Sequence, residues 1–331
     1  METERGARRN NPVLPPQEMK TFLIIDVGGT SIKIHLLYEE KKGQLKVKRE
    51  IFPTKKAENV NRLIEHIRNF FHKYPLPDTV ILGIPGEYDH KKDTLLTSPN
   101  IPAWKNLELK DTLIKGGLGR KIIVENDVNL QTLGELEKGY GKKWMNFIFL
   151  AIGTGIGSGI VIDGKLVRGS GGGAGEIGHI LIHPEGEMCG CGRRGCLEAY
   201  ASGSGIVKSY KRLGGKKDVK TSEEVYTLAV EGDETAVKAF EIMGRYLGWG
   251  IASVVNILEP EGIVLSGGVT ESRDLFEKKM VEAFKERTFT HQGRNTPIKF
   301  SLLKSHALWG GINILKKEGK IPSLVSITLS W

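Results

Sequence analysis

The sequence predicts a duplicated α/β protein with two lobes and a cleft between them. Two stretches of alternating strand and helix patterns follow one another along 331 residues, and this length exceeds what a single hydrophobic core usually organises. In each half a buried strand runs into a glycine-rich turn, at 26–30 and again at 153–159. Because the two turns take matching places, we expect both to face the same cleft.

The first half begins with three strands, after a polar lead-in over 1–18 that shows no periodicity and that we expect to be disordered. Short apolar runs predict the strands at 21–25, 31–38 and 45–52, and a charged hairpin over 41–43 joins the last two. An amphipathic helix follows over 60–71, with Leu63, Ile64 and Ile67 on one face. Strands over 79–84 and 121–125 complete this half, and the second leads into a helix that Gly139 and Gly141 stop.

The second half repeats the plan with a strand over 147–152 and a hairpin over 159–166 that turns at Asp163-Gly164. A long helix over 234–258 ends before Pro260, a buried strand follows over 262–265, and a last helix covers 308–317. We expect this last helix to pack on the first lobe. The predicted domains are therefore a small lobe of 19–127 plus 306–320, a large lobe of 128–305 with a metal-binding segment over 179–198, and a tail over 321–331.

Composition indicates a soluble globular protein, with 39% hydrophobic and 26% charged residues. The first 17 residues contain no apolar stretch of the secretory type, and no apolar run approaches the roughly 20 residues of a membrane span. We expect a cytoplasmic protein without a membrane partner. The net charge of +9 comes mostly from scattered lysine doublets, which are typical of solvated faces, so no nucleic-acid partner is expected.

Three glycine turns are candidates for a nucleotide site. After the first strand, backbone N–H groups at Gly28 and Gly29 and the hydroxyl of Thr30 suit a phosphate, and Asp26 suits Mg²⁺. The alternative is a tight hairpin whose glycines only permit the turn. We add the nearby Lys33, then Thr154 and Gly155 in the second turn, and finally Gly267 and Gly268, where a base or ribose could lie against backbone. None of the turns is a P-loop, since no Gly-Lys-Ser/Thr follows.

Asn126 and Asp127 stand between a strand and a helix. Both are preferred N-cap residues, so a purely structural role is one interpretation. Only one of them is needed as the cap, however, and a carboxylate at the mouth of a cleft can take a proton from a hydroxyl group.

Cys189, Cys191 and Cys196, the only cysteines of the chain, lie within eight residues and follow His179. Three thiolates and one imidazole form a closed tetrahedral zinc site, so we expect a structural ion there. The alternatives are His183 as the fourth ligand, or three unconnected buried thiols.

Taken in order, the motifs D-V-G-G-T, E-N-D-V-N, G-T-G-I-G-S-G, G-A-G-E-I-G-H and C-G-C-G-R-R-G-C-L-E resemble the ROK family of sugar kinases, repressors and open reading frames. The resemblance runs from about residue 20 to 319. It implies a two-lobe, actin-like (ribonuclease H-like) ATPase fold that closes around a sugar and a nucleotide, and a homo-oligomer, either dimer or tetramer.

The resemblance also implies residue roles, with glucokinases fitting best. It makes Asp127 the general base and makes the following residues sugar contacts: Asn100, Asn126, Glu176, His179 and Glu198. The implied activity is ATP-dependent phosphorylation of glucose, or a close hexose, at the 6-hydroxyl, with Mg²⁺ on ATP and zinc as a structural ion. The alternatives are kinases for N-acetylglucosamine, N-acetylmannosamine or fructose, or a sugar-responsive repressor; family repressors carry a winged helix before the first motif, and only 25 residues precede Asp26 here.

Overall fold

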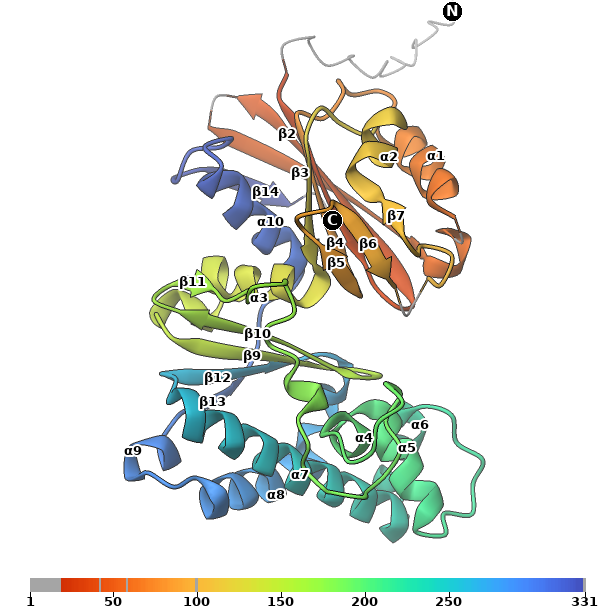
Figure 1. Cartoon of the computed structure of the whole chain (residues 1–331), viewed down its shortest axis with the longest axis vertical. Coiled ribbons are helices and arrows are strands. Elements are labelled where there is room, and N and C mark those ends of the chain that lie inside the picture. Colours follow the sequence, from red (N-terminus) through yellow and green to blue (C-terminus); the bar gives the residue numbers. More distant parts are fainter. Residues whose placement is uncertain (1–18, 42, 58, 99–100, 330–331) are drawn as a thin grey trace, which may run out of the picture. The chain divides into compact units, whose positions relative to one another are not determined.

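A computed structural model describes residues 19–329 apart from 42, 58 and 99–100, and its contacts divide the chain into two compact units (Figure 1). The described part of unit 1 comprises residues up to 86, 93–125 and 319–329, with the gaps just named. Unit 2 comprises residues 87–92 and 126–318. Two separate cores of this kind are what the length of the chain predicts.

Unit 1 is built on a six-stranded sheet with the order β14-β3-β2-β1-β4-β8. Strands β1, β2 and β3 form an antiparallel meander, whereas β4 and β14 run parallel to β1 and β3. Every residue of β1 and β4 is buried, which explains their continuous apolar sequence. The elements of unit 1 are β1 (Thr21–Val27), β2 (Ser31–Lys41), β3 (Gln44–Pro53), η1 (Thr54–Ala57), α1 (Val60–Phe71), β4 (Thr79–Ile84), β6 (Thr94–Thr97), β7 (Leu107–Glu108), α2 (Leu109–Lys115), β8 (Ile122–Asn126) and β14 (Ser326–Leu329).

The predicted tail contains a strand that the sequence analysis did not foresee. Strand β14 pairs in parallel with β3, with Ser326 opposite Gln44 and Leu329 opposite Val47. Four residues carry too little periodicity to predict a strand, and the pairing partner lies far away along the chain. Residues 326–329 therefore extend the first sheet.

Unit 2 is built on a five-stranded sheet with the order β11-β10-β9-β12-β13. Strand β9 runs antiparallel to β10 and parallel to β12, and β12 runs parallel to β13. The elements of unit 2 are β5 (Glu87–Asp89), α3 (Asp127–Lys138), η2 (Tyr140–Lys143), β9 (Phe147–Ile152), β10 (Ile156–Ile162), β11 (Lys165–Leu166), η3 (Ile177–His179), α4 (Glu198–Ala201), α5 (Gly203–Arg212), α6 (Ser222–Val230), α7 (Glu234–Leu258), β12 (Gly262–Ser266), η4 (Gly268–Ser272), α8 (Arg273–Arg287), α9 (His291–Arg294), β13 (Ile298–Phe300) and α10 (His306–Lys317).

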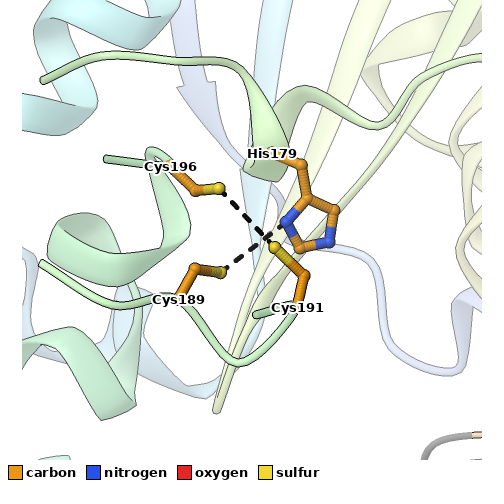
Figure 2. A group of neighbouring side chains, drawn as sticks. All are labelled: His179, Cys189, Cys191 and Cys196. Carbon is orange, nitrogen blue, oxygen red and sulfur yellow. Dashed lines mark hydrogen bonds between the residues drawn. The ribbon is translucent and has the colours of Figure 1, made fainter. Parts of the chain in front are cut away.

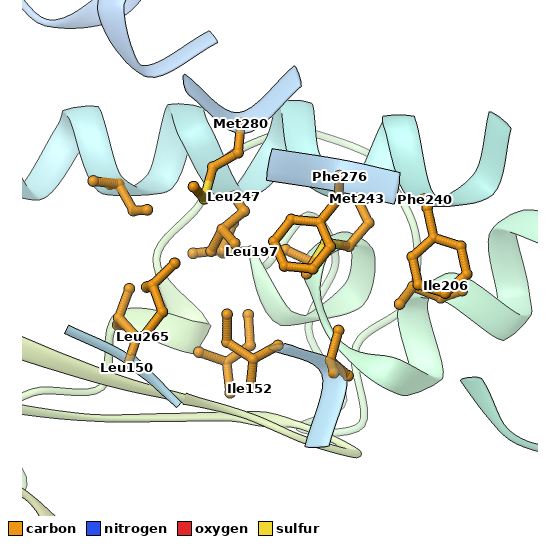
Figure 3. Close-up of a cluster of buried hydrophobic side chains, with 14 of the residues drawn as sticks. Leu150, Ile152, Leu197, Ile206, Phe240, Met243, Leu247, Leu265, Phe276 and Met280 are labelled. Carbon is orange, nitrogen blue, oxygen red and sulfur yellow. The ribbon is translucent and has the colours of Figure 1, made fainter. Parts of the chain in front are cut away.

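Helix α7 covers one face of this sheet and forms the main core of the unit (Figure 3). Asp233 caps its first turn by accepting from the N–H groups of Thr235 and Ala236, and Glu259 ends it in a left-handed conformation just before Pro260. Its apolar side chains, among them Phe240 and Leu247, belong to one buried cluster with Leu150 and other strand residues. Each such fully buried side chain contributes about 1.5–3 kcal/mol to folding.

Helices α3 and α10 lie on the opposite face of the sheet from α7 (Figure 1). They approach each other at glycines, because a side chain on Gly134 would collide with the carbonyl of His306, and one on Gly310 with that of Leu130. The sequence predicts that 306–320 belong to the small lobe. In the structure, α10 instead packs on α3 within unit 2, and the chain returns to unit 1 at Gly319.

Candidate functional site

Asn126 and Asp127 have separate positions at the start of α3. The side-chain oxygen of Asn126 accepts hydrogen bonds from the N–H groups of Val128 and Asn129, at 2.9 and 3.0 Å. Asn126 is therefore the N-cap, and its backbone has the extended conformation that caps adopt. The half-buried Asp127 is the first helical residue. Both of these capping bonds are therefore made by Asn126, and Asp127 follows it in the first turn.

The glycine-rich turn between β9 and β10 is shaped by close packing on one side. A methyl group on Gly157 would overlap Cγ2 of Val128, and one on Gly155 would overlap the carboxylate of Glu198. Around Gly153, in contrast, a methyl group would meet no described atom within 4 Å. Of these three glycines, only Gly153 has open space where a side chain would stand, whereas Glu198 and Val128 occupy that space at the other two.

Two of the predicted nucleotide turns lie at the same edge of the second sheet. Strands β9 and β12 are parallel, with Ala151 opposite Ser266, so Gly153 and Gly267 both follow the carboxyl ends of adjacent strands. Gly267 has φ of 95° and packs against the backbone of Ile152. Ligands of α/β proteins bind at this end of parallel strands. The geometry therefore brings Thr154 and Gly155 near Gly267 and Gly268.

The remaining nucleotide candidates lie in unit 1, at the turn between β1 and β2. The N–H of Gly28 donates to the carbonyl of Ser31 at 3.0 Å, and the hydroxyl of Thr54 donates to the carbonyl of Gly28 at 2.6 Å. Asp26 is 6% exposed, and its carboxylate lies 3.5 Å from the ammonium of Lys33. Gly29 and Thr30 are exposed at the tip of the turn.

The four predicted metal ligands come together in unit 2 (Figure 2). Their ligand atoms all lie within 4.8 Å of one another, with Nδ1 of His179 at 3.8 Å from Sγ of Cys189 and the sulfurs of Cys191 and Cys196 at 3.7 Å. A tight loop makes this possible: the N–H of Cys189 donates to the carbonyl of Arg193, and Gly192 turns with φ of 84°. This donor set fits a tetrahedral zinc ion.

His183, the alternative fourth ligand, is not in the cluster. Its Nδ1 lies 2.9 Å from the carbonyl of Pro184, and its ring lies near Tyr200 and Tyr246. The preferred ligand, His179, points Nδ1 at the thiols, whereas its Nε2 lies 3.9 Å from the carboxylate of Glu176. The two ring nitrogens of His179 thus face different groups.

The thiols of the cluster differ in their acidity. Burial raises the pKa of Cys189 to about 12 and also raises the pKa of Cys196. A hydrogen bond from the backbone N–H of Arg193 lowers the pKa of Cys191, which is the exposed member of the three. A bound metal ion would hold all three as thiolates, since only the deprotonated sulfur is a ligand.

The segments that carry the predicted sugar contacts of unit 2 pack on three consecutive residues at the start of β10. Gly155 contacts Glu198, Ile156 contacts Gly178 in the segment that carries Glu176 and His179, and Gly157 contacts Val128, the neighbour of Asp127. Ser158 holds the same segment, because its hydroxyl donates to the carbonyl of Gly175 and accepts from the N–H of Ile177. Asn100, the remaining predicted sugar contact, lies outside the described residues.

Three further residues that support the turn, 202–204, were not predicted from the sequence. The N–H of Gly203 donates to the carbonyl of Gly153 at 2.7 Å, and the N–H of Ser204 donates to that of Thr154 at 3.2 Å. Ser202 caps α5 by accepting from the N–H of Gly205. The sequence signal was present, since Ser202-Gly203-Ser204 is a typical helix start, but nothing in it indicated the turn as the partner.

Two α/β units with glycine-rich turns at their strand ends define the class of this chain as the two-lobe, actin-like fold. The chain matches the ROK family over residues 22–318 and belongs to that family. It is 33% identical to a glucokinase of Thermotoga maritima over 264 residues, covering 76% of this chain and 83% of that protein. It is also 32% identical to a xylose repressor of Caldicellulosiruptor bescii, covering 69% and 59% of the two chains.

Among solved structures, the chain is similar to a ROK family glucokinase from Streptomyces griseus in complex with glucose and AMPPNP. The TM-score is 0.72 at 29% identity, and the match covers 90% of this chain and 100% of that one. This confirms the family resemblance inferred from the five motifs. Across its described part, the chain has no helix long and apolar enough to cross a membrane.

Proposed function

We propose that this protein is a hexose kinase that transfers the γ-phosphoryl group of ATP to the 6-hydroxyl of glucose or a close relative. The observation that carries the proposal is the gathering of Glu198, the Glu176–His179 segment and Val128 on residues 155–157. This arrangement holds groups suited to a sugar beside a turn suited to a phosphate. The glucokinase relatives named above support glucose as the substrate.

Asp127 is the general base of the proposed reaction. Its carboxylate takes the proton of the attacking hydroxyl as the new oxygen–phosphorus bond forms and the bond from the γ-phosphorus to the bridging oxygen breaks, releasing ADP. This role is worth about 10²–10⁴ in rate. Val128 packs on Gly157 and Asn126 caps the helix, so both neighbours of Asp127 are fixed. The base is therefore held on a rigid element, as positioning for in-line transfer requires.

The three glycine turns are proposed to bind ATP. Backbone N–H groups at Thr154 and Gly155 are proposed to donate to the phosphates, while the open side of Gly268, next to Gly267, would accommodate the ribose or base. In unit 1, the exposed Gly29 and Thr30 are proposed to offer further donors, and Gly28, whose N–H donates to Ser31, shapes the turn that presents them. Mg²⁺ bound near Asp26 would neutralise charge on the phosphates. Lys33, 3.5 Å from Asp26, adds a cation to the same turn.

Sugar selectivity is proposed to come from polar groups of unit 2. The amide nitrogen of Asn126, the carboxylates of Glu176 and Glu198 and Nε2 of His179 bind sugar hydroxyls. A structural zinc ion on His179, Cys189, Cys191 and Cys196 would fix the orientation of that imidazole. A site of this kind rejects a sugar that lacks one hydroxyl, because the partner group is left unpaired.

A coupled assay with ATP and a panel of sugars tests the proposal. We expect the highest kcat/KM for glucose, with glucose 6-phosphate identified by ³¹P NMR, and lower values for fructose, N-acetylglucosamine and N-acetylmannosamine. A higher kcat/KM for another sugar would support the kinase activity but identify that sugar, not glucose, as the substrate. No turnover of any sugar with ATP would contradict the proposal.

The xylose repressor among the relatives favours one second candidate, a sugar-responsive repressor. That function requires DNA binding that weakens steeply with salt. Electrophoretic mobility with operator-length duplexes at two salt concentrations, with and without sugar, distinguishes the two. Sedimentation velocity tests the predicted dimer or tetramer in the same samples.

A further inference from the structure

Glu198 lies between the metal-ligand cluster and the glycine-rich turn, and its two carboxylate oxygens face different partners. Oε2 accepts a hydrogen bond from the backbone N–H of Ile156 at 2.8 Å. Oε1 lies 3.4 Å from the sulfur of Cys189. Because Glu198 also follows the ligand Cys196 by only two residues, its backbone is tied to the cluster as well as its side chain.

The carboxylate of Glu198 packs directly against Gly155 of the turn. A methyl group on Gly155 would overlap Oε2 of Glu198 and lie 3.2 Å from its carboxyl carbon. Ile156, whose N–H the carboxylate accepts, is 5% exposed, so water has little access as a substitute acceptor. The carboxylate of Glu198 therefore occupies the space that a side chain at position 155 would need.

The chain that follows Glu198 holds the other side of the same turn. The hydroxyl of Ser202 donates to the carbonyl of Glu198 at 2.7 Å. The next two residues, Gly203 and Ser204, donate from their backbone to the carbonyls of Gly153 and Thr154. Residues 153–156 are therefore supported on both sides by one short segment, 198–204, that begins where the cluster ends.

We propose that Glu198 is a positioning residue through which occupancy of the metal cluster controls the shape of the phosphate-binding turn. The proposal rests on the proposed function, in which residues 153–155 bind the phosphates of ATP. A bound ion fixes the loop that carries Cys189 and Cys196. That loop holds the carboxylate of Glu198 against Ile156, and the carboxylate holds the turn. Loss of the ion then weakens nucleotide binding as well as sugar binding.

Binding of ADP without sugar provides the first test, since it does not depend on the sugar contacts of Glu198. Isothermal titration calorimetry is carried out on the full chain, metal-loaded and chelator-stripped, with metal content measured by mass spectrometry. We expect stripping to raise the Kd for ADP about tenfold, the effect of losing one charge-assisted hydrogen bond. Glu198→Ala in metal-loaded protein should raise the Kd for ADP by the same factor. Removing the metal from that variant should raise the Kd little further.

Two variants control for general damage. Glu198→Gln keeps an amide oxygen that can accept from Ile156, so it should retain most of the affinity for ADP. Glu176→Ala removes the other carboxylate near the cluster, which is 67% exposed and lies 3.9 Å from His179, and should leave the Kd for ADP within twofold. Equal losses in Glu198→Ala and Glu176→Ala would overturn the proposal, as would stripping that weakens Glu198→Ala as much as wild type.

Hydrogen exchange of the amides over 153–160 provides a readout that needs no nucleotide. Exchange at Ile156 should accelerate about tenfold or more on stripping and in Glu198→Ala, while exchange in α7 stays unchanged. If loaded wild type binds no ADP but Ile156 responds in this way, the proposed function fails and the link through Glu198 stands. If ADP binds but neither metal removal nor Glu198→Ala changes the exchange rate at Ile156, the link through Glu198 is overturned and the proposed function stands.

Discussion

Gly157→Ala should displace the proposed base through a single added methyl group. The new carbon would fall closer than 3.0 Å to Cγ2 of Val128 and 3.3 Å from its Cβ, whereas carbon atoms pack at about 3.5–4.0 Å. Valine in a helix strongly prefers one rotamer, so Val128 cannot simply turn away. Relief of the overlap therefore requires α3 to move away from β10 by several tenths of an ångström.

The structure allows the size of both effects to be worked out. Overpacking of this kind costs about 1–3 kcal/mol, which corresponds to a fall in Tm of about 5 °C for a unit of this size. Asp127 precedes Val128 and moves with it. Because misplacement by about 1 Å can cost 10²-fold in rate, we expect kcat to fall about 10–100-fold. The assays are calorimetry for Tm and glucose-dependent ADP release for kcat.

Two further variants separate the contact from a general effect of substitution. Gly153→Ala adds the same methyl where no described atom lies within 4 Å, so its Tm should stay unchanged while KM for ATP rises. The double variant Gly157→Ala, Val128→Ala removes the overlapping Cγ2 and should recover most of the lost kcat. Wild-type Tm and kcat in Gly157→Ala, or no recovery in the double variant, would refute the reasoning.

Three other predictions address separate features. Asp127→Asn should lower kcat at least about 10²-fold with Kd for glucose and ATP within a few-fold; more than a tenth of wild-type kcat would leave Asp127 a structural role only. Glu135→Ala should lower the free energy of unfolding in urea by about 3–5 kcal/mol, because the fully buried carboxylate of Glu135 bonds Ser301, His306 and the N–H of Tyr140; a loss under 1 kcal/mol would contradict this. Burial, with Arg49 and Lys33 nearby, lowers the pKa of His35 to about 3. Between pH 6.5 and 3 the folded state therefore binds fewer protons than the unfolded state, and the free energy of unfolding decreases as the pH is lowered. The expected loss from pH 7 to 5 is about 2 kcal/mol, and an equal loss in His35→Asn would exclude His35 as its source.

The sequence predicted the elements whose periodicity is strong. The bounds of α1, α7, β4 and β9 agree with the predicted ranges, because an apolar stripe or a continuous buried run identifies each of them. The turn at Asp163-Gly164 is also confirmed, with φ of 51° and 67°. The place of α10 could not be predicted in this way. Its sequence specifies an amphipathic helix, but it does not indicate which other helix will pack against it or at which glycines.

The candidate site was predictable as a set of residues but not as a set of contacts. Four ligands with this spacing indicate one metal site, and the structure brings them together. The letters G-T-G-I-G-S-G, however, do not distinguish a glycine that exposes backbone to a phosphate from one that admits a neighbour. In the structure Gly155 admits Glu198 and Gly157 admits Val128. From the sequence, Glu198 is predicted to contact the sugar alone, because the residue whose N–H it accepts, Ile156, lies 42 residues away along the chain.

Thermodynamic linkage makes the proposed role of Glu198 testable from the opposite side. If the ion tightens ADP binding tenfold, ADP must tighten binding of the ion by the same factor. Competition with a zinc-selective chelator, at zero and saturating ADP, measures that second factor independently of calorimetry. In Glu198→Ala both factors should fall to about one together, since the same hydrogen bond to Ile156 carries the coupling in both directions. The proposal would be contradicted if the two factors disagreed or if the coupling persisted in Glu198→Ala. The ion would then affect the turn through other contacts, such as the backbone hydrogen bonds of Gly203 and Ser204.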